Sequence, residues 1–238
     1  MRKKLEDKVV FITHGSSFWG KALSDLFQEH GAKLVLGVPS GTTRAQTDNS
    51  IEVPIQYTEE ASWDNALKTA SNKFGQIDVL INNFNHPTAK QTLNSLDTTF
   101  YATVHNYLNS VFLGAKSTVP YLKAAGGGSI VNLVSMYANI GSPASSALAS
   151  SDGGIRTLSK SIAVQYAKYN IRSNCILMGL FATGRLNNSD TTASTPKIPM
   201  ARLGNPEELI HVVLYLSSKD SWYVTGTEII VDGGFSNA

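Results

Sequence analysis

Short apolar runs alternate with longer mixed segments along most of the chain. Seven such runs stand out, at residues 9–12, 34–36, 51–55, 79–81, 130–133, 171–177 and 228–231. Apolar runs this short, separated by helix-length segments, are typical of strands buried on both faces of a parallel sheet. The pattern therefore predicts an α/β fold, a doubly wound sheet of about seven parallel strands with helices on both faces.

Helix boundaries are marked by glycine and by capping residues. The helices expected between the strands cover residues 19–30, 62–74, about 100–125, about 144–169 and 206–217. Gly31 and Gly75 follow the first two, where a helix end favours a left-handed residue. Asn205 precedes Pro206 and two glutamates, which is the pattern of an N-cap, a proline at the first helical position and acidic residues in the first turn. The last helix therefore has the best-defined start.

Two polar segments interrupt this regularity, at residues 39–50 and 184–199. Neither carries enough apolar residues to form a buried element. The second is long enough to be a mobile flap over a pocket, since long loops in compact domains usually serve a function or are disordered. We find no internal repeat and no domain boundary, so we expect a single domain over residues 1–238.

The composition is that of a globular protein. Of 238 residues, 42% are hydrophobic and 16% are charged, which excludes a disordered or fibrous chain. The 20 lysines and arginines are nearly balanced by 18 aspartates and glutamates and are scattered, so nucleic acid is not expected as a partner. No apolar stretch approaches the roughly 20 residues of a membrane-spanning helix, and the run at 9–12 is too short for a signal peptide. A cytoplasmic protein without membrane contact is predicted.

Cysteine and metal-binding patterns add two expectations. The single cysteine, Cys175, lies in an apolar run and is expected to be a buried thiol in a reducing compartment. No cluster of histidine, cysteine, aspartate or glutamate has the spacing of metal ligands, so no metal site is predicted.

The first expected strand leads directly into a turn with glycines and then into a helix. The turn has the sequence Thr-His-Gly-Ser-Ser-Phe-Trp-Gly over residues 13–20. A dinucleotide-binding fold places a glycine-rich turn at this point, beneath the pyrophosphate of its cofactor. The turn resembles the Thr-Gly-x-x-x-Gly-x-Gly pattern of the short-chain dehydrogenase/reductase family, with His14 in place of the first glycine and Phe18 in place of the middle one.

The resemblance to this family continues along essentially the whole chain. The segments that carry it cover residues 81–85, 111–116, 128–135, 170–174, 201–208 and 223–234. It implies a Rossmann-like fold and an NAD(P)-dependent oxidoreductase acting on a carbonyl or an alcohol. The cofactor-binding positions that it implies are Thr13, Gly15, Ser16, Ser17, Gly20, Asn82 and Thr183.

The catalytic positions of the family are altered in this sequence. The family uses a serine, a tyrosine thirteen residues later, and a lysine four residues beyond the tyrosine. The lysine lowers the pKa of the tyrosine, which passes a proton to or from a substrate oxygen held by the serine. Counting from Ser135, the tyrosine position is Leu148 and the lysine position is Asp152, and the family's asparagine falls on Tyr107. Ser135, Tyr107 and Asp152 are therefore the candidate catalytic residues.

Further changes concern the cofactor. Phe18 is expected to place a ring into or beside the space of the pyrophosphate, which glycine leaves open in the family. At the end of the second strand, Val38 supplies neither an acidic residue for the adenosine ribose nor an arginine for a 2′-phosphate. Gln56 and Tyr57 replace the acidic pair partner that contacts adenine in the family. Absent or weak NAD(P) binding is expected.

Several residues in this region keep two interpretations. Ser135 either donates a hydrogen bond to a ligand or caps the end of its strand. Tyr107 and Asp152 either form a new acid/base pair, or Tyr107 fills volume in the cleft while Asp152 is solvated or salt-bridged. His14 either caps the amides of the first helix or contacts a ligand. His86, on a loop near the cleft, is expected to be exposed.

A second Tyr-x-x-x-Lys sequence occurs at Tyr215 and Lys219. It lies at the end of the last expected helix, away from the catalytic segment, so we expect a core-facing tyrosine and a solvated lysine. Four polar residues match positions that hold the family's loops together, and we expect them to be structural: Asn82, Asn132, Asn174 and Asp232.

Three functions remain open at this point. The first is a binding, assembly or regulatory subunit that has lost dehydrogenase activity. The second is a lyase, isomerase or cyclase that uses the cleft without a nicotinamide. The third is an NAD(P)-dependent oxidoreductase with a displaced proton relay. Changes at both the catalytic and the cofactor site favour the first two, because drift at one site does not by itself alter the other.

The resemblance also implies an assembly. Tetramers of the family pair their two long helices and, at a second axis, the last helix and strand. The matching segments of this chain keep their apolar content. A homotetramer, or a hetero-oligomer with a related chain, is therefore predicted, with a small molecule as the ligand of the cleft.

Overall fold

A parallel sheet of seven strands forms the centre of the protein. The structure, a computed structural model, describes residues 3–40, 46–83, 92–94, 97–183 and 197–238. The strands are β1 (Val9–Ile12), β2 (Lys33–Val38), β3 (Ser50–Pro54), β4 (Val79–Asn83), β5 (Gly128–Ser135), β6 (Ile171–Met178) and β7 (Glu228–Val231). They lie in the order β3-β2-β1-β4-β5-β6-β7. The predicted fold class is confirmed.

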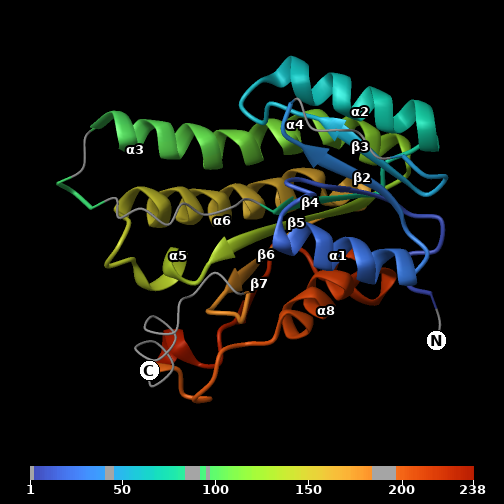
Figure 1. The fold of residues 1–238 in the computed structure, drawn as a ribbon. Helices are drawn as coiled ribbons and strands as arrows, with labels where there is room; N and C mark the ends of the chain where they lie inside the picture. The colour runs from blue at the N-terminus through green and yellow to red at the C-terminus, as the bar shows by residue number, and fades with distance from the viewer. Residues whose placement is uncertain (1–2, 41–45, 84–91, 95–96, 184–196) are drawn as a thin grey trace.

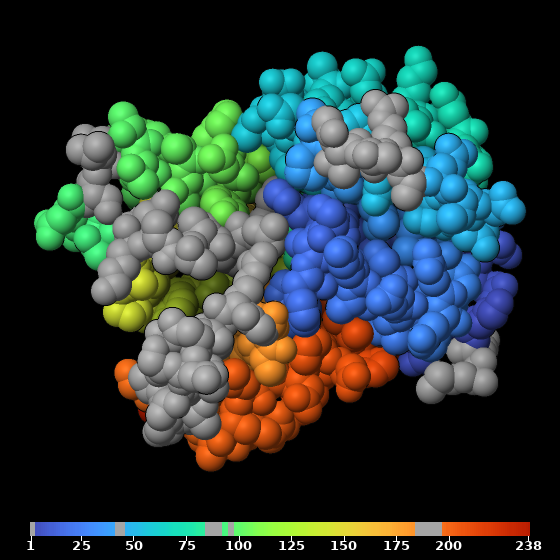
Figure 2. All heavy atoms as spheres, viewed as in Figure 1, coloured from blue at the N-terminus to red at the C-terminus, as the bar shows by residue number. Residues whose placement is uncertain are grey.

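Helices cover both faces of this sheet (Figure 1). They are α1 (Phe18–Glu29), α2 (Glu60–Phe74), α3 (Asp97–Val104), α4 (Ser110–Ala124), α5 (Tyr137–Ile140), α6 (Ser146–Tyr166) and α8 (Pro206–Ser217). One face carries α1 and α8, whose blue and orange surfaces adjoin in Figure 2. The other face carries α2, α4 and α6. Among the described residues, no helix is long and apolar enough to cross a membrane.

The strands are continuously apolar because each of them faces two cores. In β1, Val10 and Ile12 pack in the core beneath α1 and α8, whereas Val9 and Phe11 pack in the core beneath α2 and α4. The second core also holds Trp63 of α2, a fully buried side chain. Each such burial contributes about 1.5–3 kcal/mol, so period-two alternation of apolar and polar residues is not expected here.

The predicted helix ends agree with the capping geometry. Gly75 follows α2 in the left-handed region, at φ +83°, and Gly31 follows α1 at φ +85°. Asn205 and Glu208 form a reciprocal capping box at the start of α8. Each of these contacts pairs a backbone group that a helix end would otherwise leave unsatisfied.

The long helix predicted over about 100–125 is interrupted. A π-helix, η1 (His105–Asn109), separates α3 from α4. A π-turn inserts one residue into the helix and changes the direction of the side chains around it. Neither glycine nor proline marks this position, so the apolar pattern gave no signal for it.

The carboxyl ends of β5 and β6, α5 and the C-terminus all lie at one end of the molecule (Figure 1). The order of the strands reverses between β1 and β4, the neighbours at the centre of the sheet. Ligands of open α/β sheets bind outside the carboxyl ends of the strands at such a point. Of the predicted flap, residues 184–196 lie outside the described part of the chain, as does His86.

Candidate functional site

Asp152 of α6 meets the end of β5. Its Oδ2 accepts a hydrogen bond from the backbone N–H of Ser135 at 3.0 Å, and the residue is only 1% exposed. Burial raises the pKa of the carboxyl to about 7, although the hydrogen bond from Ser135 lowers it. The expectation of a solvated aspartate is therefore wrong, because the helix directs this side chain into the protein. A carboxyl with this pKa exchanges its proton near neutral pH.

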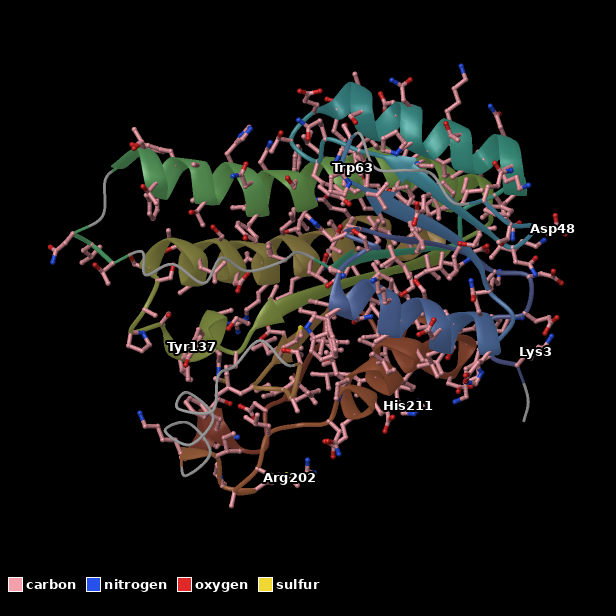
Figure 3. All side chains as sticks on the ribbon, viewed as in Figure 1. Lys3, Asp48, Trp63, Tyr137, Arg202 and His211 are labelled. Atoms are coloured by element: carbon pink, nitrogen blue, oxygen red, sulfur yellow. The ribbon has the colours of Figure 1, made fainter. Side chains whose placement is uncertain are left out.

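Ser135 is the last residue of β5 and is half-buried. Its Oγ accepts a hydrogen bond from the backbone N–H of Tyr137 at 3.2 Å. The hydroxyl thus caps the end of its strand, as one of its two interpretations has it. Its own proton remains available for donation. Tyr137, labelled in Figure 3, lies on α5 at the same end of the sheet.

Tyr107 lies within the π-helix η1, which faces α6. Burial, and to a smaller extent the negative charge of Asp152, raise the pKa of its phenol to about 12. The phenol therefore stays protonated around neutral pH and is able to donate a hydrogen bond. The structure thus brings together Ser135, Asp152 and Tyr107, the three candidate catalytic residues.

Leu148 lies one helical turn before Asp152 on α6 and is half-buried. Its backbone N–H donates to Oγ of Ser145, the N-cap of the helix, at 3.2 Å. This side chain cannot transfer a proton. Of the two positions on α6 that the family uses for proton transfer, only Asp152 therefore carries an ionisable group.

The turn between β1 and α1 is held in place by the end of β4. The backbone N–H of Asn83 donates to Oγ1 of Thr13 at 2.7 Å, and its side-chain amide donates to the carbonyl oxygen of Thr13 and to Oγ of Ser17. Sequence reasoning missed Asn83, although it directly follows Asn82 at the end of an apolar run. Ser16, also in the turn, is exposed.

Two glycines allow the turn to pack closely. A Cβ at Gly20 would lie 2.5 Å from the carbonyl oxygens of both His14 and Gly15, and one at Gly15 would lie 2.6 Å from Cβ of Leu36. Neither position admits a side chain unless the backbone moves. The turn therefore keeps its compact form despite its two substitutions.

His14 stacks on Tyr57. The two ring centroids are 4.4 Å apart, and the backbone N–H of His14 donates to the Tyr57 hydroxyl at 2.6 Å. Burial lowers the pKa of the imidazole to about 4, so the ring is neutral around neutral pH. The expectation that His14 caps α1 is wrong, because Ser17 is the N-cap and accepts from the backbone N–H of Gly20. The stack lies where β1 and β3 end.

Phe18 begins a row of aromatic rings. It is 37% exposed and meets Trp19 edge-on at 5.3 Å. Trp19 meets Phe181, beyond β6, in the same way at 5.3 Å. Thr183, two residues further on, is half-buried and donates its backbone N–H to the carbonyl oxygen of Phe181 at 2.9 Å. These rings connect the turn with the segment that follows β6.

Asn82 is buried between the sheet and α4. Its side-chain amide donates to Oδ1 of Asn132 at 2.7 Å, and Asn132 in turn donates to Ser159 of α6. Asn174 and Asp232 likewise bind backbone groups of neighbouring loops. All four residues therefore serve structural hydrogen bonds, as expected.

The second Tyr-x-x-x-Lys pair lies far from this site in the chain, at the end of α8. Tyr215 is 36% exposed, so the expectation of a core-facing tyrosine is wrong. Lys219 lies over the ring of Trp222, 5.1 Å from its centroid. Within the described ranges, no three histidine, cysteine, aspartate or glutamate side chains are grouped so that they could hold a metal ion.

Comparison with known proteins identifies the family. The sequence profile of the family described as enoyl-(acyl carrier protein) reductase matches residues 17–236. The chain belongs to the short-chain dehydrogenase/reductase family. A 7α-hydroxysteroid dehydrogenase of Clostridium sardiniense is 30% identical, over 98% of this chain and 95% of that protein.

Two further members of the short-chain dehydrogenase/reductase family show a similar likeness. A 3-oxoacyl-(acyl-carrier-protein) reductase of Thermotoga maritima is 31% identical, over 97% of this chain and 98% of that protein. A 2,5-dichloro-2,5-cyclohexadiene-1,4-diol dehydrogenase of Sphingobium indicum is 29% identical, over 99% of both chains. The likeness to each relative thus extends over the whole sheet.

The turn can be tested against the dinucleotide that the family implies. Gly15 and Gly20 keep the backbone of the turn compact, because a Cβ at either position would collide with Leu36 or with the carbonyl oxygens of His14 and Gly15. The backbone at the phosphate end therefore suits a dinucleotide, although His14 and Phe18 add side chains where the family has glycine. At the adenosine end, Val38 is fully buried and carries no charge or hydrogen-bonding side chain for a ribose. The His14–Tyr57 stack lies beside this end. The residues thus fit the diphosphate better than the adenosine.

Proposed function

We propose that this chain is an oxidoreductase that interconverts a carbonyl and an alcohol, with Asp152 exchanging the substrate proton. The three relatives described above are named dehydrogenases or reductases, and they support this proposal over a subunit without activity. The observation that carries it is the buried carboxyl beside Ser135, whose pKa of about 7 suits general acid–base catalysis near neutral pH.

Each side chain of the cluster has a separate role in this proposal. In reduction, protonated Asp152 gives its proton toward the substrate oxygen, and in oxidation the carboxylate takes one up. Ser135 donates a hydrogen bond that holds this oxygen. The phenol of Tyr107 remains protonated, since its pKa is about 12, and acts as a second donor. Leu148 contributes an apolar wall.

A nicotinamide cofactor, when bound, supplies or accepts the hydride. Ser17 and the backbone around Gly15 and Gly20 would hold its diphosphate, while Thr13, which is fully buried, fixes the turn to the end of β4. We infer weak binding, because the adenosine end offers Val38 in place of a charged residue. The names of the relatives span a steroid, a chlorinated diol and an acyl-carrier-protein thioester, so the proposal extends only to the carbonyl or alcohol group itself.

Asp152→Asn tests the proton-exchanging role. The amide keeps the shape of the side chain and can still accept from Ser135, but it cannot ionise. We expect NADH- or NADPH-dependent reduction of a ketone panel to fall by about 10²–10⁴-fold, the usual contribution of general acid–base catalysis. Ser135→Ala should also reduce the rate, whereas Lys219→Ala should leave it unchanged. Equal rates in Asp152→Asn and the unaltered protein would exclude the proposed role.

A binding or regulatory subunit is the second candidate. Leu148 at the tyrosine position and the His14–Tyr57 stack beside the adenosine end support it. Titration of the purified protein with NADH and NADPH, followed by calorimetry, separates the two candidates. Measurable binding of either cofactor, even if weak, supports the oxidoreductase. Absence of both binding and turnover would favour the subunit, and turnover without either cofactor would favour a lyase or isomerase.

We also propose that the chain assembles as a homotetramer or with a related chain. Apolar side chains are exposed on the helices and at the sheet edge that would pair. Phe112 of α4 is 47% exposed, Val164 of α6 is 82% exposed and Ile230 of β7 is 42% exposed. Light scattering at micromolar concentration should give a mass of about four chains. A monomer would contradict the proposal.

A further inference from the structure

Arg156 joins three elements around the candidate site. It lies on α6, one helical turn after Asp152. Its Nη1 donates to the carbonyl oxygen of Ala138 at 2.6 Å. Its Nε and Nη2 donate to Oε2 of Glu228 at 3.0 and 2.6 Å. The guanidinium is thus bound on both sides, by α5 and by the first residue of β7.

The contacts of Asp152 and Arg156 hold the same short segment. Ser135 binds Asp152 through its backbone N–H, and Ala138, three residues later, binds Arg156 through its carbonyl oxygen. The acceptor Asp152 and the donor Arg156 are one turn apart on α6, and α5 lies alongside this helix (Figure 1). The segment is therefore fixed to α6 at two points.

Glu228 anchors the guanidinium in a partly buried position. The side chains of Arg156 and Glu228 are 21% and 17% exposed, and Glu228 also pairs with Lys160, one turn further along α6. Burial raises the pKa of Glu228, but hydrogen bonds from Arg156 and Lys160 outweigh this effect and lower it below its usual value. Glu228 is therefore charged around neutral pH and keeps Arg156 in place.

We propose that Arg156 is a positioning residue, which holds the segment after Ser135 against α6 and so sets how the Ser135 amide meets Asp152. Only the catalytic consequence of this inference rests on the proposed function. An arginine suits the task because its planar group can donate to a carbonyl and a carboxylate simultaneously. Lysine has one compact ammonium and cannot bridge them with the same geometry.

The proposal predicts a change at a group that Arg156 itself does not bind. Without the contact to Ala138, the hydrogen bond from Ser135 to Asp152 weakens. This bond favours the ionised carboxyl, so its loss raises the pKa of Asp152. Of the described residues, Tyr107 faces this carboxyl from η1 and Ser135 faces it from β5, and both remain in every variant used below.

The test follows the titration of Asp152 by NMR of the full chain, with ¹³C in the aspartate carboxyls. The spectrum of Asp152→Asn identifies the signal. In Arg156→Gln we expect the midpoint to rise by about one pH unit, which is about tenfold in proton affinity. In Lys160→Met the midpoint should not change, because the contact between Arg156 and Ala138 is kept. This variant is the matched control, since it also removes a positive charge and a partner of Glu228.

Arg156→Lys separates position from charge. It keeps the positive charge, so a positioning role predicts that its midpoint also rises, whereas a purely electrostatic role predicts the original midpoint. It also supplies the test if Arg156→Gln does not fold, as judged by circular dichroism. An unchanged midpoint in Arg156→Lys, or an equal rise in Lys160→Met, would overturn the proposal.

The result can be told apart from the outcome for the proposed function. The titration needs neither cofactor nor turnover. If the midpoint rises while no carbonyl is reduced by the unaltered protein, the positioning role stands and the oxidoreductase proposal fails. If reduction occurs, the alkaline limb in the pH profile of kcat/KM, where Asp152 loses the proton that it donates, should move with the NMR midpoint in Arg156→Gln and stay in place in Lys160→Met.

Discussion

Asp152 carries a carboxyl group that the fold buries almost completely. Its pKa rises from an ordinary 3.8 to about 7, so the folded chain binds this proton more tightly than the unfolded chain does. Between these two values the native state holds more protons. The contribution of protonated Asp152 to the free energy of unfolding is therefore at its maximum below about pH 4, and it is lost as the pH rises to about 7.

Asp152→Asn should remove this pH dependence. Near pH 4 we expect both proteins to have similar free energies of unfolding. At pH 8 the variant should be the more stable by up to about 4 kcal/mol, about 1.4 kcal/mol for each of about three pH units. Urea unfolding at the two pH values measures this difference. If Asp152→Asn and the unaltered protein have the same free energy of unfolding at both pH values, the carboxylate of Asp152 is as well stabilised in the native protein as in water.

At the scale of elements, the turn between β1 and α1 combines a retained backbone with two unusual side chains. His14 is held by Tyr57, at φ +48°, and Phe18 is held by Trp19. Positive φ is costly for a residue with a Cβ, and the stack offsets this cost. The side chains of His14 and Phe18 thus occupy space that glycine at these two positions would leave empty.

Replacing both residues with glycine should reopen the turn. We expect His14→Gly combined with Phe18→Gly to bind NADH more tightly than the unaltered chain does, although only partly, since Val38 remains at the adenosine end. Fluorescence titration measures the affinity. Tyr223→Gly, which removes a fully exposed aromatic ring between α8 and β7, is the matched control and should have no effect. Tight binding by the unaltered protein would contradict this explanation.

Elements whose form depends on local sequence were predictable. The apolar runs became strands because the sheet is buried on both faces, and α8 begins at Pro206 because its capping residues are adjacent in the chain. Counting from Ser135 also placed Asp152 in the site. The His14–Tyr57 stack and the Arg156–Glu228 pair join residues 43 and 72 positions apart, and no local pattern encodes such contacts.

At the scale of the whole molecule, the sheet has two ends of different character. β3 forms one edge and β7 the other, and β7 is the less buried, with Ile230 exposed. A single sheet receives strands from both halves of the chain. We therefore propose that residues 1–238 form one domain, which unfolds in one cooperative transition of the assembled protein.

Ile230→Glu should separate subunits without unfolding them. A charge at a subunit contact is desolvated when the contact forms, which opposes assembly, whereas the exposed position tolerates it in the folded chain. We expect light scattering to give a lower mass while circular dichroism is unchanged. Val212→Ala, on α8 and half-buried, provides a control for general weakening. An unchanged mass would exclude β7 from the subunit contact.

Trp63 gives the protein a built-in optical probe. Its side chain is labelled in Figure 3. Its indole N–H donates to the carbonyl oxygen of Tyr57 at 2.9 Å, and the ring centroids of these two residues lie 5.7 Å apart. Buried indoles emit at shorter wavelength than solvated ones, so its emission is distinguishable from that of Trp222, which is 67% exposed. With Trp19→Phe and Trp222→Phe, all remaining tryptophan emission of this three-tryptophan chain arises from Trp63, beside the His14–Tyr57 stack. A compound without absorbance or fluorescence of its own that binds beside the His14–Tyr57 stack could then be detected by the change in Trp63 fluorescence.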